Sequence, residues 1–398
     1  MRVLQISHKP PLPLIDGGCI AINHITELLL RNKYKVKVLT LSTPKHPFIS
    51  NTFSESYIQN TAIESCFIDT SLNWFSAFKN LLKNQSYNVS RFYSNKFSNL
   101  ISKTLQNQPY DIIILESIFV APYIDTIRKN SDAKIILRAH NIEHQLWEIQ
   151  AKFCKNNLKK GYLTVLAKQL KSFEIDVFKS VDGILSITQN DTNTIQIYPN
   201  TSSLLLPFGI EIPKIELIDK PKTNTLKLFF IGSMDWSPNI ESVDWFLDNI
   251  WNELLEKHPS LEFHLAGKAM PKKYFEKKLK NFYCHGEVNN AQDFMVKYDV
   301  LVAPVFSGGG VKIKILEAMA MQKLVVTTAF GIAGLDVKDK KHVLLIDSKQ
   351  SIFNIVDNLL TNFQQFEEIT QNAFRYLTDN HNNHILAEKL NQYLESLS

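Results

Sequence analysis

The chain has 398 residues, of which 44% are apolar and 21% are charged, and its formal net charge at pH 7 is +5. This composition is ordinary for a globular protein and excludes a largely disordered or fibrous chain. The length exceeds what one hydrophobic core usually serves, so we expect two domains of roughly 150 to 200 residues each.

The four cysteines stand singly, without the paired spacing of a zinc site or of a secreted disulfide framework, and we expect them to be reduced. The first residues, MRVLQISHKPPLP, lack the pattern of a secretory leader. No apolar run approaches the roughly 20 residues that cross a bilayer. We therefore expect a cytoplasmic protein, with any membrane contact peripheral and at the inner face of the cell membrane.

In chain order, short β-branched runs alternate with longer amphipathic stretches, which is typical of βαβ units and a parallel sheet. The first half predicts strands at residues 3–7, 36–41, 112–115, 134–139, 183–188 and 203–206. The second half predicts strands at residues 226–231, 262–266, 282–285, 300–304, 324–327 and 343–346. The same pattern thus occurs twice and predicts two α/β domains.

A segment with three prolines and no helical period separates the two series of strands. We therefore assign residues 1–206 to the first domain, 207–225 to a linker and 226–380 to the second domain. Residues 381–398 carry apolar side chains at helical spacing. They are predicted to form a helix that could return to the first domain.

Glycine is scarce, at 13 residues, yet it is concentrated in two turns: Gly17 with Gly18, and Gly308 to Gly310. Each cluster follows a predicted strand and precedes a predicted helix. In an open parallel sheet this is the carboxyl edge, where ligands bind and helix N-termini present free N–H groups to anions. Glycine also lets a ligand approach the backbone closely.

The second cluster reads FSGGGVKIKILEAMA, and its two lysines, Lys312 and Lys314, place positive charge at the start of a helix. Glycines and lysines in this order suit a diphosphate; the alternative is a flexible surface turn. Glu317 follows one to two turns into the helix. It is either a carboxylate that accepts hydrogen bonds from ribose hydroxyls or an ordinary solvated residue.

Several motifs follow one another along nearly the whole chain: the Gly17–Gly18 turn, RAHNIEH at 138–144, LPFGIE at 206–211, FIGSMDWSPN at 230–239, and SGGGVKIKILEAMA followed by LVVTT. In their order and spacing the chain resembles glycosyltransferase family 4. The resemblance implies a GT-B fold, with two Rossmann-like, doubly wound parallel-sheet α/β domains facing a central cleft. It also implies a nucleotide sugar bound mainly by the C-terminal domain, an acceptor held mainly by the N-terminal one, and transfer with retention of the anomeric configuration.

The resemblance further implies roles for individual residues. Lys312 or Lys314 would neutralise the departing nucleoside diphosphate, Glu317 would bind the ribose, and His140 would face the transferred sugar and the acceptor. The backbone positions assigned to the donor site are Gly17, Gly18, Gly232, Ser233, Gly308, Gly309, Gly310 and Val311.

Two departures from the family pattern are visible. The family's usual pair of glutamates is eight positions apart, but Gly309 stands eight positions before Glu317. The usual Arg and Lys after the first strand of the second domain are replaced by the run from Ser233 to Trp236. The first change removes a contact to the donor sugar, and together they indicate a subgroup of the family.

No two aspartates are separated by one residue, so the chain has no DxD motif for a divalent metal. We expect metal-independent transfer, in which lysines, backbone N–H groups and a helix dipole balance the charge of the leaving group. The HNIEH segment at 140–144 does not favour zinc, because it is not HExxH and no third ligand is indicated. His140 is either a hydrogen-bonding group of the active site or a cap at the strand end.

Two basic stretches stand out in the first half. Residues 70–110 hold five basic and no acidic side chains, interleaved with aromatic ones, and residues 151–173 hold six lysines and no acid. Such stretches suit anionic lipid headgroups, or else they are solvated helix faces over an apolar core. Neither contains a nucleic-acid-binding motif, so we expect no nucleic-acid partner.

The sequence therefore predicts a glycosyltransferase that moves a sugar from a nucleoside-diphosphate sugar to a hydroxyl of a glycan or a lipid-linked acceptor, without a further cofactor. Cell-surface polysaccharide synthesis is the expected context. Two alternatives stay open: a sugar-nucleotide epimerase, which would turn over without an acceptor, and a non-catalytic protein that binds a nucleotide sugar.

Overall fold

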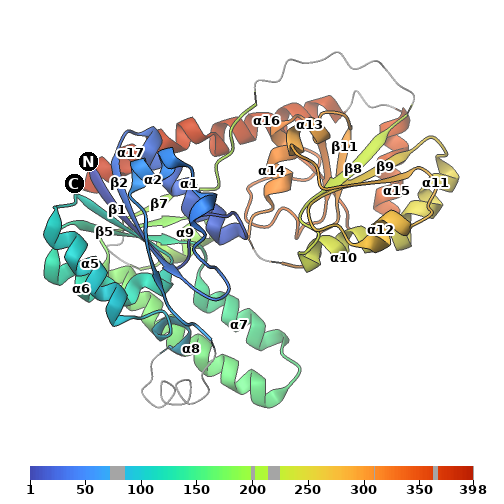
Figure 1. Ribbon diagram of the computed structural model, residues 1–398. Coiled ribbons are helices and arrows are strands. Elements are labelled where there is room, and N and C mark those ends of the chain that lie inside the picture. Colours follow the sequence, from blue (N-terminus) through green and yellow to red (C-terminus); the bar gives the residue numbers. More distant parts are fainter. Residues whose placement is uncertain (72–85, 199–201, 214–224, 309, 362–365, 398) are drawn as a thin grey trace. The chain divides into compact units, whose positions relative to one another are not determined.

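The computed structural model describes residues 1–71, 86–198, 202–213, 225–308, 310–361 and 366–397. The chain divides into two compact units (Figure 1). Unit 1 comprises Met1–Phe208 and His384–Ser398, and unit 2 comprises Gly209–Asn383. Most of the expected linker, residues 214–224, lies outside the described residues.

Unit 1 contains a seven-stranded parallel sheet with the strand order β3-β2-β1-β4-β5-β6-β7. The strands are β1 (Arg2–Ser7), β2 (Lys35–Ser42), β3 (Glu64–Phe67), β4 (Ile112–Glu116), β5 (Lys134–Ala139), β6 (Gly183–Ser186) and β7 (Ser203–Leu205). The helical segments are α1 (Gly17–Arg31), η1 (Ser50–Thr52), α2 (Glu55–Thr61), α4 (Tyr87–Ser90), α5 (Asn95–Asn107), η2 (Ile118–Tyr123), α6 (Ile124–Asn130), α7 (Glu143–Phe153), α8 (Asn157–Ser180), α9 (Gln189–Ile195) and α17 (Asn383–Leu397).

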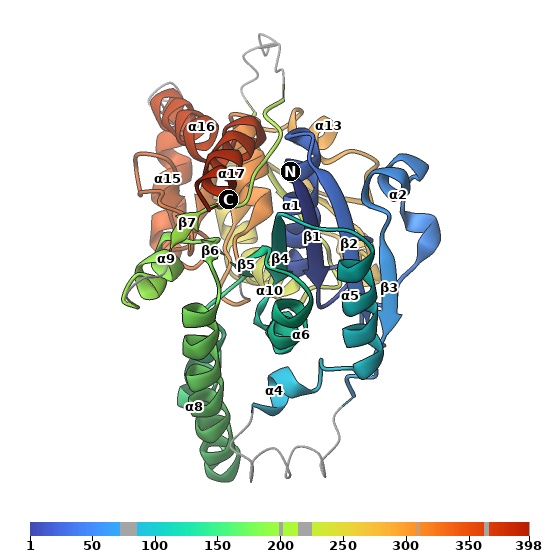
Figure 2. The same cartoon turned by 90° about the vertical axis from the view of Figure 1, so that its left-hand side faces the viewer.

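The strands of unit 1 are apolar on both faces, because helices cover the sheet on both sides (Figure 2). Alternate strand residues enter two separate cores: in β4, Ile113 packs with Phe97 of α5, whereas Ile112 packs with Ile25 of α1. Leu386 of the C-terminal helix α17 belongs to this second core. Residues from both ends of the chain therefore build unit 1.

Unit 2 contains a six-stranded parallel sheet with the order β10-β9-β8-β11-β12-β13. Its strands are β8 (Lys227–Ile231), β9 (Glu262–Ala266), β10 (Phe282–Gly286), β11 (Val300–Ala303), β12 (Leu324–Thr327) and β13 (Leu344–Leu345). Its helical segments are α10 (Ser237–Phe246), the π-helical turn η3 (Leu247–Trp251), α11 (Asn252–Lys257), α12 (Lys272–Glu276), α13 (Ala291–Met295), α14 (Ile313–Ala320), α15 (Lys349–Thr361) and α16 (Glu367–His381).

Both sheets have a topological switch point, where the strand order reverses. In unit 1 it lies between β1 and β4, and in unit 2 between β8 and β11. Open α/β sheets bind ligands outside the carboxyl ends of the strands at such points. The segments after these four strands are therefore where a site is expected on each unit.

Candidate functional site

The glycine loop of unit 2 follows β11, at the switch point. Gly308 has a φ of +92° and Gly310 a φ of +72°, a region that L side chains rarely adopt. A Cβ at Gly308 would lie 2.6 Å from Cζ2 of Trp236, so glycine is also required for space there. Gly309 lies outside the described residues.

The turn after β8 packs tightly against this loop's helix. A Cβ at Gly232 would lie 2.8 Å from Nδ2 of Asn239 and 3.0 Å from Nζ of Lys314. The Asn239 amide donates a hydrogen bond of 2.7 Å to the carbonyl of Ser233. Predicted donor residues that are some 80 positions apart in sequence, Gly232 and Lys314, are thus neighbours in the fold.

The two predicted lysines have different surroundings. Lys314 donates to Oδ1 of Asn239, and its ammonium lies 4.1 Å from the centre of the Phe230 ring. Burial, aided by Lys312, lowers the pKa of Lys314 to about 7. Nζ of Lys312 donates to the carbonyl of Gly310 at 2.6 Å, so this side chain folds back on the loop, and burial lowers its pKa to about 8.

Helix α14 begins at Ile313, one residue later than Lys312, which is the N-cap residue and provides no side-chain cap. Lys312 therefore lies before the first turn and not in it, which corrects the expectation that both lysines start the helix. The N–H of Ile315 donates to the carbonyl of Lys312 at 2.9 Å, but no side chain caps this end of the helix, so the N–H groups that precede it can face an anion.

Glu317 and Val311 are both half-buried beside this loop. Burial raises the pKa of Glu317 to about 7, against the opposing effect of Lys314. A carboxyl with this pKa gains hydrogen bonds on ligand binding at little desolvation cost, because its surroundings are already largely dry.

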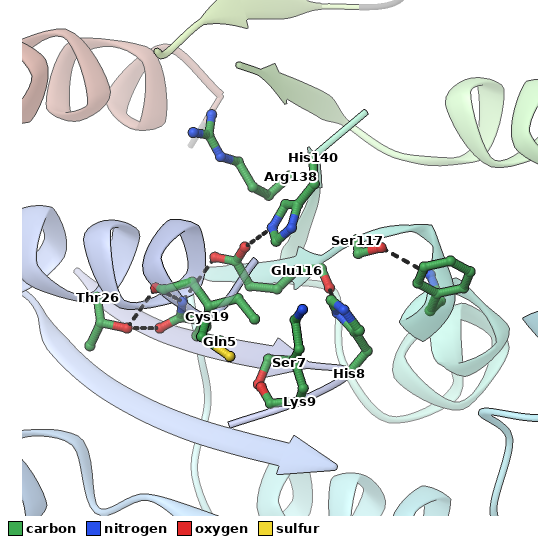
Figure 3. A network of polar contacts seen from close by, with 12 residues as sticks. Gln5, Ser7, His8, Lys9, Cys19, Thr26, Glu116, Ser117, Arg138 and His140 are labelled. Carbon is green, nitrogen blue, oxygen red and sulfur yellow. Dashed lines mark hydrogen bonds and ion pairs between the residues drawn. The ribbon is translucent and has the colours of Figure 1, made fainter. Parts of the chain in front are cut away.

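A polar network of unit 1 lies at the ends of β1, β4 and β5 (Figure 3). Nε2 of His140 is 2.8 Å from Oε2 of Glu116, whose side chain is fully buried. The other oxygen, Oε1, accepts a hydrogen bond of 2.8 Å from Nε2 of Gln5. Oε1 of Gln5 in turn accepts from the Thr26 hydroxyl at 2.7 Å, which fixes the direction of the Gln5 amide.

Burial determines where the proton between Glu116 and His140 lies. It raises the pKa of the Glu116 carboxyl, against the opposing effect of Arg138, and it lowers the pKa of the His140 imidazole. Both directions favour a neutral pair, with the carboxylic acid donating to Nε2 of His140. The histidine then carries its own proton on Nδ1 and can donate a hydrogen bond from that atom.

Arg138 is the strand neighbour of Glu116, and its guanidinium is fully buried. Its NH1 group donates to the carbonyl of Ser186 at 3.1 Å, while Nε and NH2 have no hydrogen-bond partner among the described residues. The structure records no ion pair between Arg138 and Glu116, although the two lie on adjacent strands. This is the arrangement expected if the Glu116 carboxyl is neutral.

The Gly17–Gly18 turn is held by Asp16. Its carboxylate accepts from the backbone N–H of Cys19 at 3.0 Å, which caps helix α1, and from Nζ of Lys9 at 2.7 Å. A Cβ at Gly18 would lie 2.4 Å from Nζ of Lys9, whereas one at Gly17 would meet nothing within 4 Å. Glycine is thus required at position 18 to let Lys9 reach Asp16.

In two groups of potential metal ligands, side chains already bond to other protein groups. In the HNIEH segment, His140 bonds Glu116 while Nδ1 of His144 lies 2.6 Å from Glu174, so the two histidines do not converge. Asp16, Cys19 and His46 form a second group whose ligand atoms lie within 4.8 Å of one another. There the Asp16 oxygens already contact the ammonium of Lys9, which occupies the place of a cation.

Glu116, Arg138, Lys9 and Asn239 also belong to these sites and were not expected as site residues. Arg138 and Asn239 stand in the motifs at 138–144 and 230–239, and Lys9 lies between the first strand and the Gly17–Gly18 turn, so their positions were a usable signal. Glu116 is the last residue of an apolar strand, and no neighbouring residue in the sequence indicates whether its carboxyl has a functional role or merely ends the strand.

A pocket of about 360 Å³ also lies beside Gly286, lined in part by His285, Phe294 and Tyr298.

Comparison with known proteins bears mainly on unit 2. The model of the family described as Glycosyl transferases group 1 matches residues 225–362, which lie within this unit. Over 395 residues the chain is also 23% identical to a 44.6 kDa protein in the cps region of Klebsiella pneumoniae, with 96% of each chain covered.

Solved structures match the chain over nearly its whole length. A sucrose-phosphate synthase from Thermosynechococcus elongatus has a TM-score of 0.67 at 12% identity, covering 100% of this chain and 99% of that one. Anabaena HepE, solved in complex with UDP, has a TM-score of 0.65 at 11% identity, with 100% of both chains covered. TarM has a TM-score of 0.64 at 12% identity, with 99% of both covered. These matches confirm the predicted GT-B fold of two parallel-sheet domains.

The described residues also bear on the expected membrane contact. Among them, no helix has both the length and the apolar character that a bilayer crossing demands. In the first basic stretch, residues 72–85 lie outside the described residues, and Phe92 and Phe97 are buried in the core. Those two rings are therefore not part of an aromatic surface, whereas Tyr93 of the same stretch is exposed.

Proposed function

We propose that this protein is a glycosyltransferase that moves a sugar from a nucleoside-diphosphate sugar to a hydroxyl of a glycan or lipid-linked acceptor. The proposal includes retention of the anomeric configuration, a family 4 assignment, and a cytoplasmic role in cell-surface polysaccharide synthesis. The relative from a cps region supports this context, and the complex of HepE with UDP supports a nucleotide donor by analogy.

The proposal rests on the close approach of Lys314 to Gly232 at the switch point of unit 2. Gly308 and Gly310 lie in the loop that precedes the helix of Lys314. When the bond between the sugar and the β-phosphate breaks, negative charge develops on the departing diphosphate. Uncapped N–H groups of α14 and the buried ammonium of Lys314 stabilise that charge. Glu317 holds the ribose.

On unit 1, His140 takes part as a hydrogen-bond donor to the transferred sugar or the acceptor. The neutral pair with Glu116 leaves Nδ1 of His140 protonated, so the ring donates without carrying a charge. A Cβ at Gly17 would meet nothing within 4 Å, so a substrate can approach the backbone of the neighbouring turn there, whereas Lys9 lies against Gly18.

The test is a turnover assay on the purified chain with UDP, GDP, ADP and TDP sugars, each with and without candidate glycan and lipid-linked acceptors. We expect release of one nucleoside diphosphate that depends on an acceptor, and a product whose anomeric configuration, measured by NMR, matches that of the donor. Turnover of the sugar nucleotide without an acceptor would instead identify an epimerase. Binding without any turnover would identify a non-catalytic protein.

Metal independence has its own control in the same assay. Because lysines and N–H groups supply the positive charge, EDTA should leave the rate unchanged. Loss of activity with EDTA and its recovery with Mn²⁺ would show that this account of the phosphate site is wrong.

A further inference from the structure

Helices α7 and α8 form a hairpin that extends away from the sheet of unit 1, with the turn between them at its far end (Figures 1 and 2). We call residues 152–160, which span this turn, the hairpin tip. Leu158 and Phe153 of the tip are 88% and 76% exposed, more than any other large apolar side chain among the described residues. Large apolar side chains at this exposure indicate a surface that something covers.

The uncovered apolar surface follows one face of each helix. On α7 it consists of Leu146, Ile149 and Phe153, at spacings of three and four residues, which share a helix face. On α8 it consists of Leu158, Tyr162 and Val165, at spacings of four and three. These helices also bury apolar side chains on another side, so the exposed stripes are additional to the core.

The tip is strongly basic. Lys152, Lys155, Lys159 and Lys160 are all exposed, and no acidic residue occurs between positions 151 and 173. None of these four lysines forms an ion pair with the residues that the structure describes. Two apolar side chains thus lie among four free positive charges.

We propose that the hairpin tip docks on an anionic lipid bilayer, with Phe153 and Leu158 inserted at the boundary of headgroups and acyl chains and the four lysines beside the lipid phosphates. Unpaired lysines around exposed apolar side chains are complementary to such a surface, where each basic residue near the anionic headgroups adds to binding. This inference goes beyond the proposed function and stands without it.

The test is co-sedimentation of the full chain with vesicles of phosphatidylcholine alone and of phosphatidylcholine mixed with phosphatidylglycerol. We expect binding to the mixed vesicles only, weakened by added salt because salt screens the lysines. The double variant Phe153→Ser, Leu158→Ser should bind about tenfold more weakly, since it loses the inserted apolar surface. Lys155→Glu, Lys159→Glu should abolish binding.

The matched control is Lys103→Glu, Lys129→Glu, which makes the same change in net charge at two exposed lysines elsewhere on unit 1. It should bind as the wild type does; an equal loss would show that diffuse net charge, and not the tip, attracts the protein. A Phe153→Trp variant reports insertion independently, through a blue shift of its fluorescence with mixed vesicles. No shift, or tip variants that change only the oligomeric state in ultracentrifugation, would overturn the proposal.

Discussion

The proton between Glu116 and His140 is the most informative feature at the scale of single residues. Gln5 donates to one carboxyl oxygen, and the carbonyl oxygen of a neutral carboxyl is the better acceptor, so the proton is favoured on the other oxygen, which faces His140. The arrangement makes Glu116 a positioning residue that selects the tautomer of His140. In this proposal the site uses the protonated carboxyl of Glu116 and not its negative charge.

This account predicts opposite outcomes for two substitutions of Glu116. Glu116→Gln keeps an acceptor for Gln5 and offers an N–H donor to Nε2 of His140, so turnover should stay close to the wild-type rate. Glu116→Leu leaves Nε2 of His140 without its donor, and the rate should fall on the order of tenfold. ¹⁵N NMR of labelled histidine should show the Nδ1–H tautomer of His140 in the wild type and in Glu116→Gln. A dead Glu116→Gln enzyme with normal stability would mean that Glu116 acts as a carboxylate.

The same pair predicts a dependence of stability on pH. The pKa of Glu116 is raised to about 8 in the folded protein, so its contribution is full below its unfolded pKa and is lost as pH rises toward 8. Wild type should therefore lose stability over this range relative to Glu116→Gln, by at most about 1.4 kcal/mol per pH unit. Parallel denaturation curves of the two proteins at every pH from 5 to 8 would contradict the protonated state.

Sequence alone could identify the backbone positions of the site better than its polar network. Gly308 and Gly310 were predictable because a scarce residue is concentrated where a strand meets a helix. The bond between Glu116 and His140 joins strands 24 positions apart, and neither residue carries a local signal of the other. The HNIEH segment, which resembles a metal site in sequence, could likewise be interpreted only from the fold, where the His144 ring bonds to Glu174.

At the scale of elements, each of the twelve predicted strands overlaps a strand of the structure, because apolar β-branched runs between polar turns mark buried parallel strands. The run at 343–346 shortens to Leu344–Leu345. Strand β3 was missed, since its sequence ESCF is short, polar at its start and lies at the sheet edge. Edge strands are covered on fewer sides and so carry a weaker apolar pattern.

The glycine loop before α14 yields a prediction at this scale. Gly308→Ala adds a Cβ at a φ of +92° and only 2.6 Å from Trp236, so the loop must shift, and nucleotide affinity should fall by at least about tenfold. Gly161→Ala is the control, because its Cβ meets nothing within 4 Å and the residue lies inside α8. This control should bind nucleotide normally and be slightly more stable in a thermal melt. Equal affinity for the two variants would show that the loop does not hold the diphosphate.

At the scale of the whole molecule, one chain builds two similar parallel-sheet units and then returns through α17 to complete the first. The repeat of the strand pattern predicts this architecture from sequence. The sequence did not specify which core the C-terminal helix packs against. Its apolar spacing indicates only that one face of the helix is buried. Leu390 and Leu394 pack with Val3, from the other end of the chain.

We propose above all that unit 2 binds the diphosphate of a nucleotide sugar through the ammonium of Lys314. Titration calorimetry of the full chain with UDP, GDP, ADP and TDP, comparing wild type with Lys314→Met, tests it most directly. Methionine keeps the apolar stem over Phe230 but removes the ammonium, so we predict that the diphosphate of one base binds wild type and binds the variant at least about tenfold more weakly. Equal affinity of the two proteins, or no binding of any nucleoside diphosphate, would contradict the account.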